Sequence, residues 1–381
     1  RIITMIKVAK IKPGILRIAG IALSISALLI FGMASSYAHH SSTPHFDPDK
    51  PLTIQGVVTS FRFVNPHAWI YLDVVGADGN TKAWNCELGA ASGLRRAGWT
   101  EELLKPGTEI TLEGIAARRD PFGCSFRNAE LGDGTLLARS GEITAGSEVF
   151  VNVEETAESV AATETNTFFG TWQTAPRNRR PGGGGGNPAG GGTPEDQAAL
   201  FTSRYGELVT EAGRMASAAY DQRFDDPALK CSPSSIIRGW SEPSGISEIT
   251  QSGDQIVIKH EFMDTVRVIN MDTREHPNDI EPSMTGHSIG WYEDDVLVVE
   301  TAGFEAGVLV PHPGLLHSED MVITERLSLS ETGQLTRDYS VVDPQYLVKP
   351  LTGSNAWNRT AIALPEYGCV ELGGVSNERP E

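Results

Sequence analysis

The chain has 381 residues, of which 40% are hydrophobic and 21% are charged, and its 49 acidic residues outnumber its 31 basic residues. This length leaves room for two modest domains. The formal net charge of −18 repels phosphate backbones, so we expect no nucleic-acid partner.

The first 38 residues have the pattern of an export signal. Basic residues from Lys7 to Arg17 precede the apolar run 18–34, and Ser36-Tyr37-Ala38 ends in a small-x-small cleavage pattern. We therefore expect a signal peptide over residues 1–38, cleaved after Ala38, and a periplasmic or secreted mature protein. An uncleaved membrane anchor is the alternative.

An exported protein can form disulfides, and the four cysteines fall two and two across the expected domains. We predict that Cys86 pairs with Cys124 and that Cys231 pairs with Cys369. Each pair would stabilise its domain by about 4 kcal/mol, the wider loop slightly more. A four-thiolate zinc site is the alternative, but the cysteines lack CxxC spacing.

Residues 39–152 are expected to form one small β-barrel. Alternating apolar residues predict three strands, then one helix, then two strands, at 52–64, 67–75, 81–88, 91–104, 108–118 and 124–131. This element order is typical of an OB-fold. The segment has ten basic and fourteen acidic residues, which favours a protein or oligosaccharide partner over nucleic acid.

An acidic linker at 153–166 is expected to lead into a second domain at 167–381. Residues 178–194 are rich in glycine and predict a flexible loop inside this domain. A helical insertion should follow at about 195–220, opened by Thr193 with Asp196 three residues on as a loose capping box.

The rest of the second domain alternates as strands. Hairpins are predicted around Gly253, at residues 293–295 and at Thr332-Gly333, with a further strand at 264–271. Successive hairpins describe an up-and-down meander, which closes into a barrel to remove its edges. The expected fold class is therefore mostly β, with two small antiparallel barrels and a helical insertion in the second.

Three resemblances accompany these patterns. Gly170-Thr171-Trp172, followed by sequential hairpins, resembles the G-x-W strand of lipocalin-like barrels. Ala38-His39-His40-Ser41 and Val64-Asn65-Pro66-His67 resemble the mature start and the V-N-P-H motif of an exported bacterial family of unknown function. The sequence of residues 286–304 is similar to that of uncharacterised exported bacterial proteins. The resemblances imply barrel folds but no activity.

Residues 286–290, GHSIG, match the G-x-S-x-G spelling of a serine-hydrolase nucleophile elbow. An elbow requires a buried strand before the serine and a helix after it. Residues 276–284 contain two prolines and no apolar run, and residues 291–301 alternate as a strand. We therefore interpret the match as coincidental, with the glycines permitting a bend or bulge at a strand start, and expect no catalytic residue.

Polar residues on the second domain's strands are candidates for a ligand site. Inward-facing groups of this kind can hold a carboxylate or hydroxyl of a ligand, or a metal. The alternative is that they are solvated strand residues or ion pairs that close the barrel. The predicted ligand-binding residues are His260, Arg267, His287, Glu300 and Arg326.

The mature N-terminus is a candidate copper site. Cleavage after Ala38 would give His39 a free α-amine that chelates together with its imidazole. His40 and His67 can add the further nitrogens of the square-planar set that Cu(II) prefers. Mobile termini and chance histidine pairs are the alternative.

The function we expect is exported, non-catalytic binding of a small, partly apolar ligand in the second barrel. The first domain would then serve as a partner or metal module. Two alternatives stay open. One is a periplasmic copper-binding protein, and the other is a hydrolase or isomerase that uses the neighbourhood of His287 and Glu300.

Overall fold

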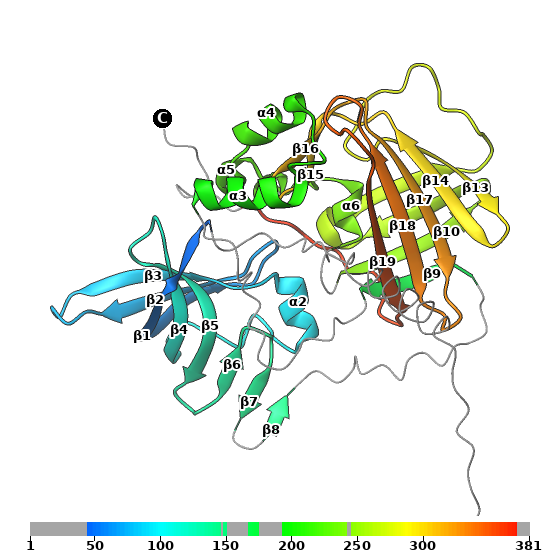
Figure 1. Cartoon of the computed structure of the whole chain (residues 1–381). Coiled ribbons are helices and arrows are strands. Elements are labelled where there is room, and N and C mark those ends of the chain that lie inside the picture. The colour runs from blue at the N-terminus through cyan, green and yellow to red at the C-terminus, as the bar shows by residue number, and fades with distance from the viewer. Residues whose placement is uncertain (1–43, 146–147, 151–166, 175–192, 242–244, 372–381) are drawn as a thin grey trace, which may run out of the picture. The chain divides into compact units, whose positions relative to one another are not determined.

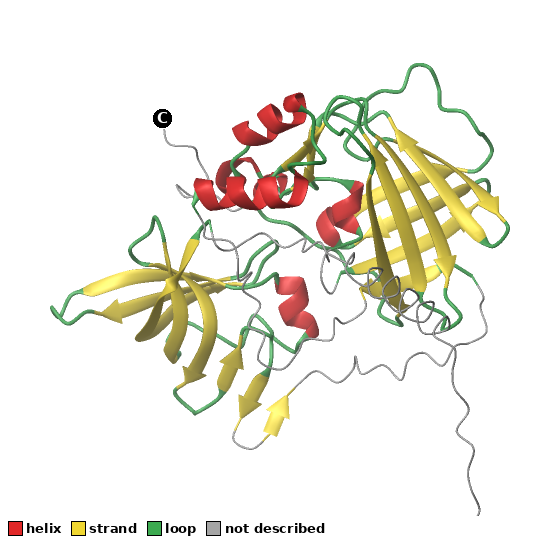
Figure 2. Cartoon of the chain, in the orientation of Figure 1, coloured by secondary structure: helices red, strands yellow, loops and turns green. Residues whose placement is uncertain are grey.

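The computed structural model describes residues 44–145, 148–150, 167–174, 193–241 and 245–371, and strands dominate it (Figures 1 and 2). The expected signal peptide, the acidic linker and the glycine-rich loop up to residue 192 lie outside these residues. In the described ranges, every helix is too short or too polar to cross a membrane. The predicted fold class, mostly β, is confirmed.

The first sheet closes on itself in OB-like order. Its five main strands are β1 (Phe46–Arg62), β2 (Trp69–Val75), β3 (Thr81–Glu87), β4 (Glu109–Ala117) and β5 (Gly123–Leu131). The sheet runs β3-β2-β1-β4-β5, and a parallel pairing of β3 with β5 joins its two ends. Short strands β6 (Leu136–Ala138), β7 (Ile143–Ala145) and β8 (Glu148–Phe150) extend the sheet beyond β5.

The single predicted helix of this part is shorter than its pattern suggested. Helix α2 spans Ala91–Arg96, and the residues up to 104 form turns. Gly98 adopts a φ of 94°, a conformation that side-chain-bearing residues avoid, and so it ends the helix. Trp99 is then buried against Phe126 in the sheet's core.

Nine strands form a second, closed barrel. They are β9 (Gly170–Thr174), β10 (Ile246–Ser252), β11 (Gln255–His260), β12 (Thr265–Asn270), β13 (His287–Glu293), β14 (Val296–Ala302), β17 (Val322–Leu329), β18 (Leu335–Val342) and β19 (Leu351–Arg359). The order around the ring is β10-β11-β12-β13-β14-β17-β18-β19-β9 (Figure 1). The predicted hairpins at Gly253, at 293–295 and at Thr332-Gly333 are confirmed.

The expected up-and-down meander is wrong at one place. Neighbours in a closed ring can all be antiparallel only when the number of strands is even, so a ring of nine must contain a parallel pair. That pair is β12 and β13, which the loop 271–286 connects. The sequence pattern had suggested a chain of hairpins because each strand alternates in the same way, whatever its direction.

Helices and one small hairpin lie beside the barrel. They are α3 (Pro194–Tyr205), α4 (Glu211–Ala219), α5 (Gln222–Asp225), η2 (Pro227–Lys230), α6 (Ile236–Gly239) and η3 (Phe262–Asp264), with β15 (Gly307–Val310) paired to β16 (Leu315–His317). The predicted capping box is confirmed, since Thr193 and Asp196 exchange side-chain and backbone hydrogen bonds at the start of α3.

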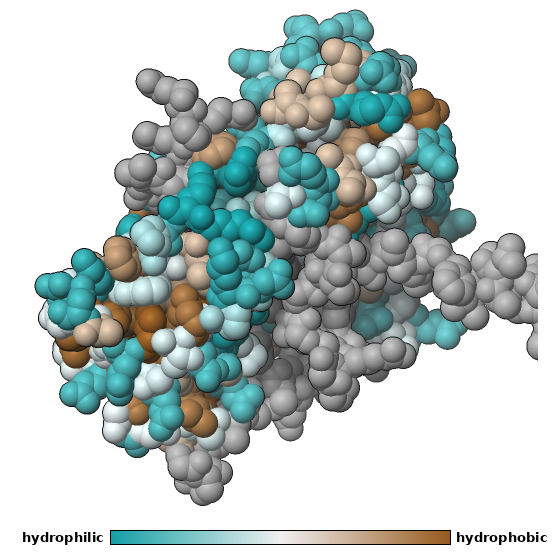
Figure 3. Space-filling view, turned by 60° about the vertical axis from the view of Figure 1, so that its left-hand side comes forward, coloured by the Kyte–Doolittle hydropathy of each residue, from teal (hydrophilic) through white to brown (hydrophobic). Residues whose placement is uncertain are grey.

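The surface carries no large apolar face in the view of Figure 3, where hydrophilic residues surround small hydrophobic groups.

Both predicted disulfides are confirmed: Cys86 is bonded to Cys124 between β3 and β5, and Cys231 is bonded to Cys369. The second bond ties the segment after η2 to a part of the chain beyond β19.

Replacing Cys231 and Cys369 with serine should destabilise the protein. A cross-link of sequence separation 138 restricts the unfolded chain, and the chain-entropy model gives about 5 kcal/mol for a loop of this length. Denaturant unfolding, followed under non-reducing conditions, measures the loss. Replacing Cys86 and Cys124, separated by 38 residues, is the matched comparison, with an expected loss of about 4 kcal/mol. An unchanged unfolding midpoint for the first variant would contradict this account.

Candidate functional site

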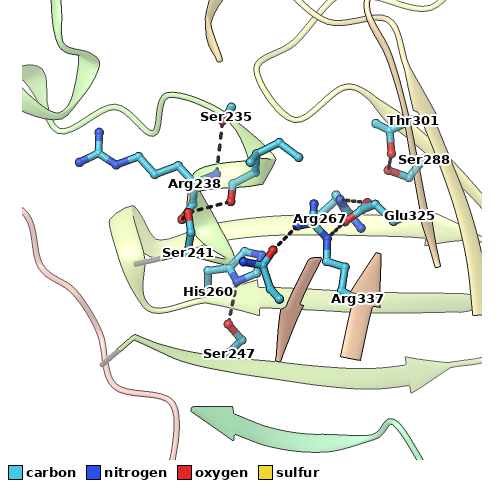
Figure 4. Close-up of polar contacts among 12 residues, drawn as sticks. Ser235, Arg238, Ser241, Ser247, His260, Arg267, Ser288, Thr301, Glu325 and Arg337 are labelled. Carbon is cyan, nitrogen blue, oxygen red and sulfur yellow. Dashed lines mark hydrogen bonds and ion pairs between the residues drawn. The ribbon is translucent and has the colours of Figure 1, made fainter. Parts of the chain in front are cut away.

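Three charged side chains meet inside the second barrel. Arg267 on β12, Glu325 on β17 and Arg337 on β18 are 2%, 0% and 0% exposed (Figure 4). Each side chain points inward. The residues two places before and after it in its strand are apolar or buried. In the described strands of the barrel, these are the buried side chains that carry a formal charge at neutral pH.

The glutamate lies between the two arginines. Its Oε1 accepts a hydrogen bond from Nε of Arg337 at 2.5 Å, and its Oε2 is 2.5 Å from Nη1 of Arg267 in an ion pair. Burial alone would raise the pKa of the Glu325 carboxyl, but Arg267 and Arg337 together hold this pKa below its usual value. The group is therefore a carboxylate, and the three side chains carry a net charge of +1.

Several nitrogen atoms around this cluster lack a hydrogen bond to any described residue. They are Nε and Nη2 of Arg267, Nη2 of Arg337 and Nε1 of Trp240. A buried donor left in this state is costly, and a charged one is more so. Both carboxylate oxygens of Glu325 already face an arginine nitrogen, so these donors have no acceptor among the described residues of the cluster.

Aromatic rings surround the same charges. The guanidinium of Arg337 lies 4.6 Å from the Tyr339 ring centre and 5.7 Å from that of Trp240. Trp240 follows α6 and packs on Trp357 of β19, with ring centres 4.6 Å apart. The charged cluster is thus bordered by flat apolar surfaces, as in sites for partly apolar molecules.

His260, a predicted ligand residue, belongs to this interior but not as a cation. Its Nδ1 lies 2.8 Å from the hydroxyl of Ser247, and its ring packs on Trp240. Burial, followed by the charges of Arg267 and Arg337, lowers the pKa of His260 to about 3. A neutral imidazole leaves the net charge of the interior unchanged.

Three other predicted ligand residues lie on the outer surface of the barrel. Arg326 alternates with the inward Glu325 and is 46% exposed, where it pairs with Glu293. Glu300 and His287 are likewise outward, because their neighbours Thr301 and Ser288 face the interior. The structure therefore brings together His260 and Arg267, and it separates Arg326, His287 and Glu300 from them.

Ser288 of the GHSIG pattern lies in β13, so the predicted strand after Gly286 is confirmed. Its hydroxyl shares a hydrogen bond of 2.8 Å with the hydroxyl of Thr301 on β14 (Figure 4). Gly286, with a φ of 64°, makes the bend that leads into the strand. These contacts are those of a paired strand residue.

The predicted copper residues are only partly within the described chain. His39 and His40 lie outside it, and His67 follows β1 in the first sheet. Nδ1 of His67 is 3.1 Å from the carbonyl oxygen of Leu88 and 3.1 Å from a carboxylate oxygen of Glu87. Over the described residues, no three histidine, cysteine or acidic side chains are grouped to hold a metal.

Arg337 and the two tryptophans were not predicted as site residues, although the sequence held a signal. Leu335, Arg337 and Tyr339 alternate on one face of a strand, as do Ile323, Glu325 and Leu327. A charge inserted into an inward apolar series is the pattern of a buried ion pair. Only the register between β17 and β18, which places Glu325 opposite Tyr339, shows that the charges meet.

The fold and this interior define a closed β-barrel protein with a charged core. Among known families, the model of a family of unknown function, DUF6152, matches residues 27–124, less than half of the chain. It supports the expectation of an uncharacterised family for that part.

Among curated proteins, no match was found. Among solved structures, a mutant of the fluorescent protein UnaG is 13% identical, and the alignment covers 51% of this chain and 97% of that one, with a TM-score of 0.23. A superposition this loose carries no argument, and the barrel is defined by its own strand pairing.

Changing Glu325 to Gln should destabilise the barrel strongly. The variant would leave two buried guanidinium groups facing each other without a counter-charge, which costs about 3–5 kcal/mol. Urea unfolding followed by tryptophan fluorescence measures the change. Glu293→Gln, which breaks the exposed pair with Arg326, is the control and should have little effect. Equal stabilities for the two variants would show that the interior is not charge-balanced as described.

Proposed function

We propose that the protein binds a small, partly apolar molecule bearing an anionic group, and that the binding site is the interior of the second barrel. The observation that carries this proposal is the surplus of buried positive charge on Arg267, Glu325 and Arg337. An anionic group would neutralise that charge, and its oxygen atoms would accept hydrogen bonds from the guanidinium nitrogens that lack them.

The apolar part of the ligand would lie against the aromatic residues. Trp240, Trp357 and Tyr339 offer flat surfaces next to Arg337. Burying apolar area there contributes about 25 cal/mol per Å², so a ligand with one ring or a short chain gains several kcal/mol. This division between a charged end and an apolar body matches a carboxylate or sulfonate amphiphile.

The same geometry gives little support to a reaction. The outward His287 and Glu300 do not share the interior with Arg267, and Ser288 is hydrogen-bonded to Thr301. We therefore favour binding over hydrolysis or isomerisation as the function, in a mature protein that we expect to be exported.

Changing Arg267 to Met should weaken anion binding while the protein remains folded. The substitution removes one charge, leaves Glu325 and Arg337 as a neutral pair, and keeps a side chain of similar volume. The affinity for anilinonaphthalene sulfonate, measured by fluorescence titration, should fall about 10-fold to 100-fold, which corresponds to roughly 1.4–2.8 kcal/mol. Thermal stability should be equal or higher.

Two controls make this result specific. Arg326→Met removes an arginine from the outer surface and should leave binding unchanged. N-phenylnaphthylamine, a neutral probe of similar shape, should bind wild type and Arg267→Met alike. If the sulfonate binds both proteins equally, the buried arginines are not the anion site and the proposal fails.

A second candidate function is copper binding through His39, His40 and His67. One observation favours it: Nδ1 of His67 lies 3.1 Å from the carbonyl oxygen of Leu88, a contact of the kind that orients metal-binding histidines. The backbone carbonyl would then orient this histidine as metal-binding histidines usually are.

Copper binding predicts a specific EPR signal. Exported protein titrated with Cu(II) should give the spectrum of a nitrogen-rich square-planar site, and both His39→Ala and His67→Ala should weaken its affinity about 10-fold or more. His45→Ala, a histidine outside the proposed set, serves as the control. Full affinity in both test variants would remove this candidate.

A further inference from the structure

The wall of the second barrel is weakest between β12 and β13. The registered pairs at this junction are Ile269 with Ser288 and Asn270 with Ile289, whereas β13 pairs with β14 along its whole length. The chain that enters β13 bends at Gly286 toward the end of β14, where Ser283 bridges to Phe304. Residues 265–268 of β12 therefore have no registered strand beside them on this side among the described residues.

This weak junction, which we call the seam, lies next to the candidate site. Arg267 is in the unpaired stretch of β12, and its side chain points inward to Glu325. Its neighbours Val266 and Val268 point outward and are 49% and 40% exposed. Arg267 therefore lies on the inner face of the stretch of β12 that has no registered strand partner at the seam.

The loop 271–286, which connects the two seam strands, is held against β13 and β14 by side chains. The guanidinium of Arg274 lies 4.9 Å from the ring centre of Trp291. Ile280 packs so closely on Gly303 that a Cβ atom there would clash. The third contact joins the rings of His276 and His287, whose Nδ1 atoms are 2.9 Å apart.

The contact between the histidines requires a defined proton arrangement. Nδ2 of Asn270 lies 3.2 Å from the carbonyl oxygen of Ser288, to which it donates, and 3.3 Å from Nε2 of His287. His287 then accepts at Nε2 and carries its proton on Nδ1, which donates to Nδ1 of His276. The proton of His276 is left on Nε2, facing the Glu300 carboxylate at 3.5 Å. Both rings are neutral in this arrangement.

We infer that the loop 271–286 is a pH-sensitive lid over the seam, and that the seam is the route by which a ligand reaches Arg267. The route rests on the proposed function, whereas the lid does not. Closing needs the neutral histidine pair, since a protonated His276 would present an N–H to the N–H of His287. Opening would release the loop from β13 and β14 and free the chain that enters β13 beside the unpaired stretch of β12.

Few groups other than the histidines act on this contact. Glu300 on β14 is the acidic group that faces His276, Asn270 on β12 is uncharged, and Arg274 of the loop is stacked on Trp291. Burial, followed by the neighbouring His287, lowers the pKa of His276, and Glu300 opposes this only in part. A histidine with a lowered pKa in the closed state stabilises closing above its ordinary pKa of about 6.5. That stabilisation is lost as the pH falls below this value.

Hydrogen exchange of the ligand-free protein tests the lid. Peptides covering 272–286, compared at pH 7 and pH 5 after correction for intrinsic exchange rates, should lose protection about tenfold on acidification. His276→Asn keeps an acceptor for Nδ1 of His287 but cannot be protonated, so its loop should lose far less. Glu275→Gln, an exposed change in the same loop, should respond as wild type does. Loop protection that is the same at both pH values, or an unaltered response in His276→Asn, would overturn the lid.

Stopped-flow fluorescence with anilinonaphthalene sulfonate, which stays anionic at both pH values, tests the route. The association rate should rise between pH 7 and pH 5 in wild type and much less in His276→Asn, and the signal should require Arg267. An association rate whose pH dependence is the same in wild type and in His276→Asn would overturn the route while leaving the proposed function intact. A probe that fails to bind wild type at all would overturn the proposed function and the route together, while the exchange experiment still decides the lid.

Discussion

One carboxylate between two arginines is the interaction on which the barrel depends. Glu325 is ionised because Arg267 and Arg337 flank it, and the arginines can be buried because Glu325 offsets one of their charges. The balance is incomplete by one positive charge. A buried group of this kind is strongly unfavourable without a partner, so the interior is suited to an anion in a way that a purely apolar barrel would not be.

Strand number places this interior beside the short parallel pairing of the barrel wall. A ring of nine strands must include a parallel pair, and a parallel pair requires a long connection in place of a tight turn. Here that connection is the loop 271–286, and its strands share only a short register. The topology that interrupts the meander is thus the same feature that leaves the edge of β12 beside Arg267 uncovered by a strand.

Much of the fold follows from alternation and turn residues. Hairpins at Gly253 and at Gly333 could be predicted because glycine there adopts a positive φ that short turns require. The parallel pair could not be predicted, since side chains alternate in the same way in parallel and antiparallel strands. Helix α2 ended early because Gly98, which looked like an ordinary member of a helical run, takes a left-handed conformation.

The candidate site could likewise be predicted only in part. Alternation shows which residues of a strand share a face, but it does not show which residues of different strands meet. His260 and Arg267 could be assigned to inward faces from the period of their own strands. Arg326 was placed inward in error, because its neighbour Glu325 occupies the inward position and the two alternate. Strand register decides which inward residues meet, and register depends on tertiary packing that a single sequence does not reveal.

The charge of the whole chain bears on what can enter such a barrel. A formal charge of −18 repels anions at long range, although salt limits this repulsion to about 8–10 Å. The buried +1 charge attracts an anion only once it has entered and lost its water. A small inorganic anion would gain little against that cost, whereas an amphiphile also buries apolar area against Trp240 and Trp357. On the proposed function, the net negative charge of the chain and the positive charge of the interior would therefore favour a ligand whose apolar part supplies most of the binding free energy.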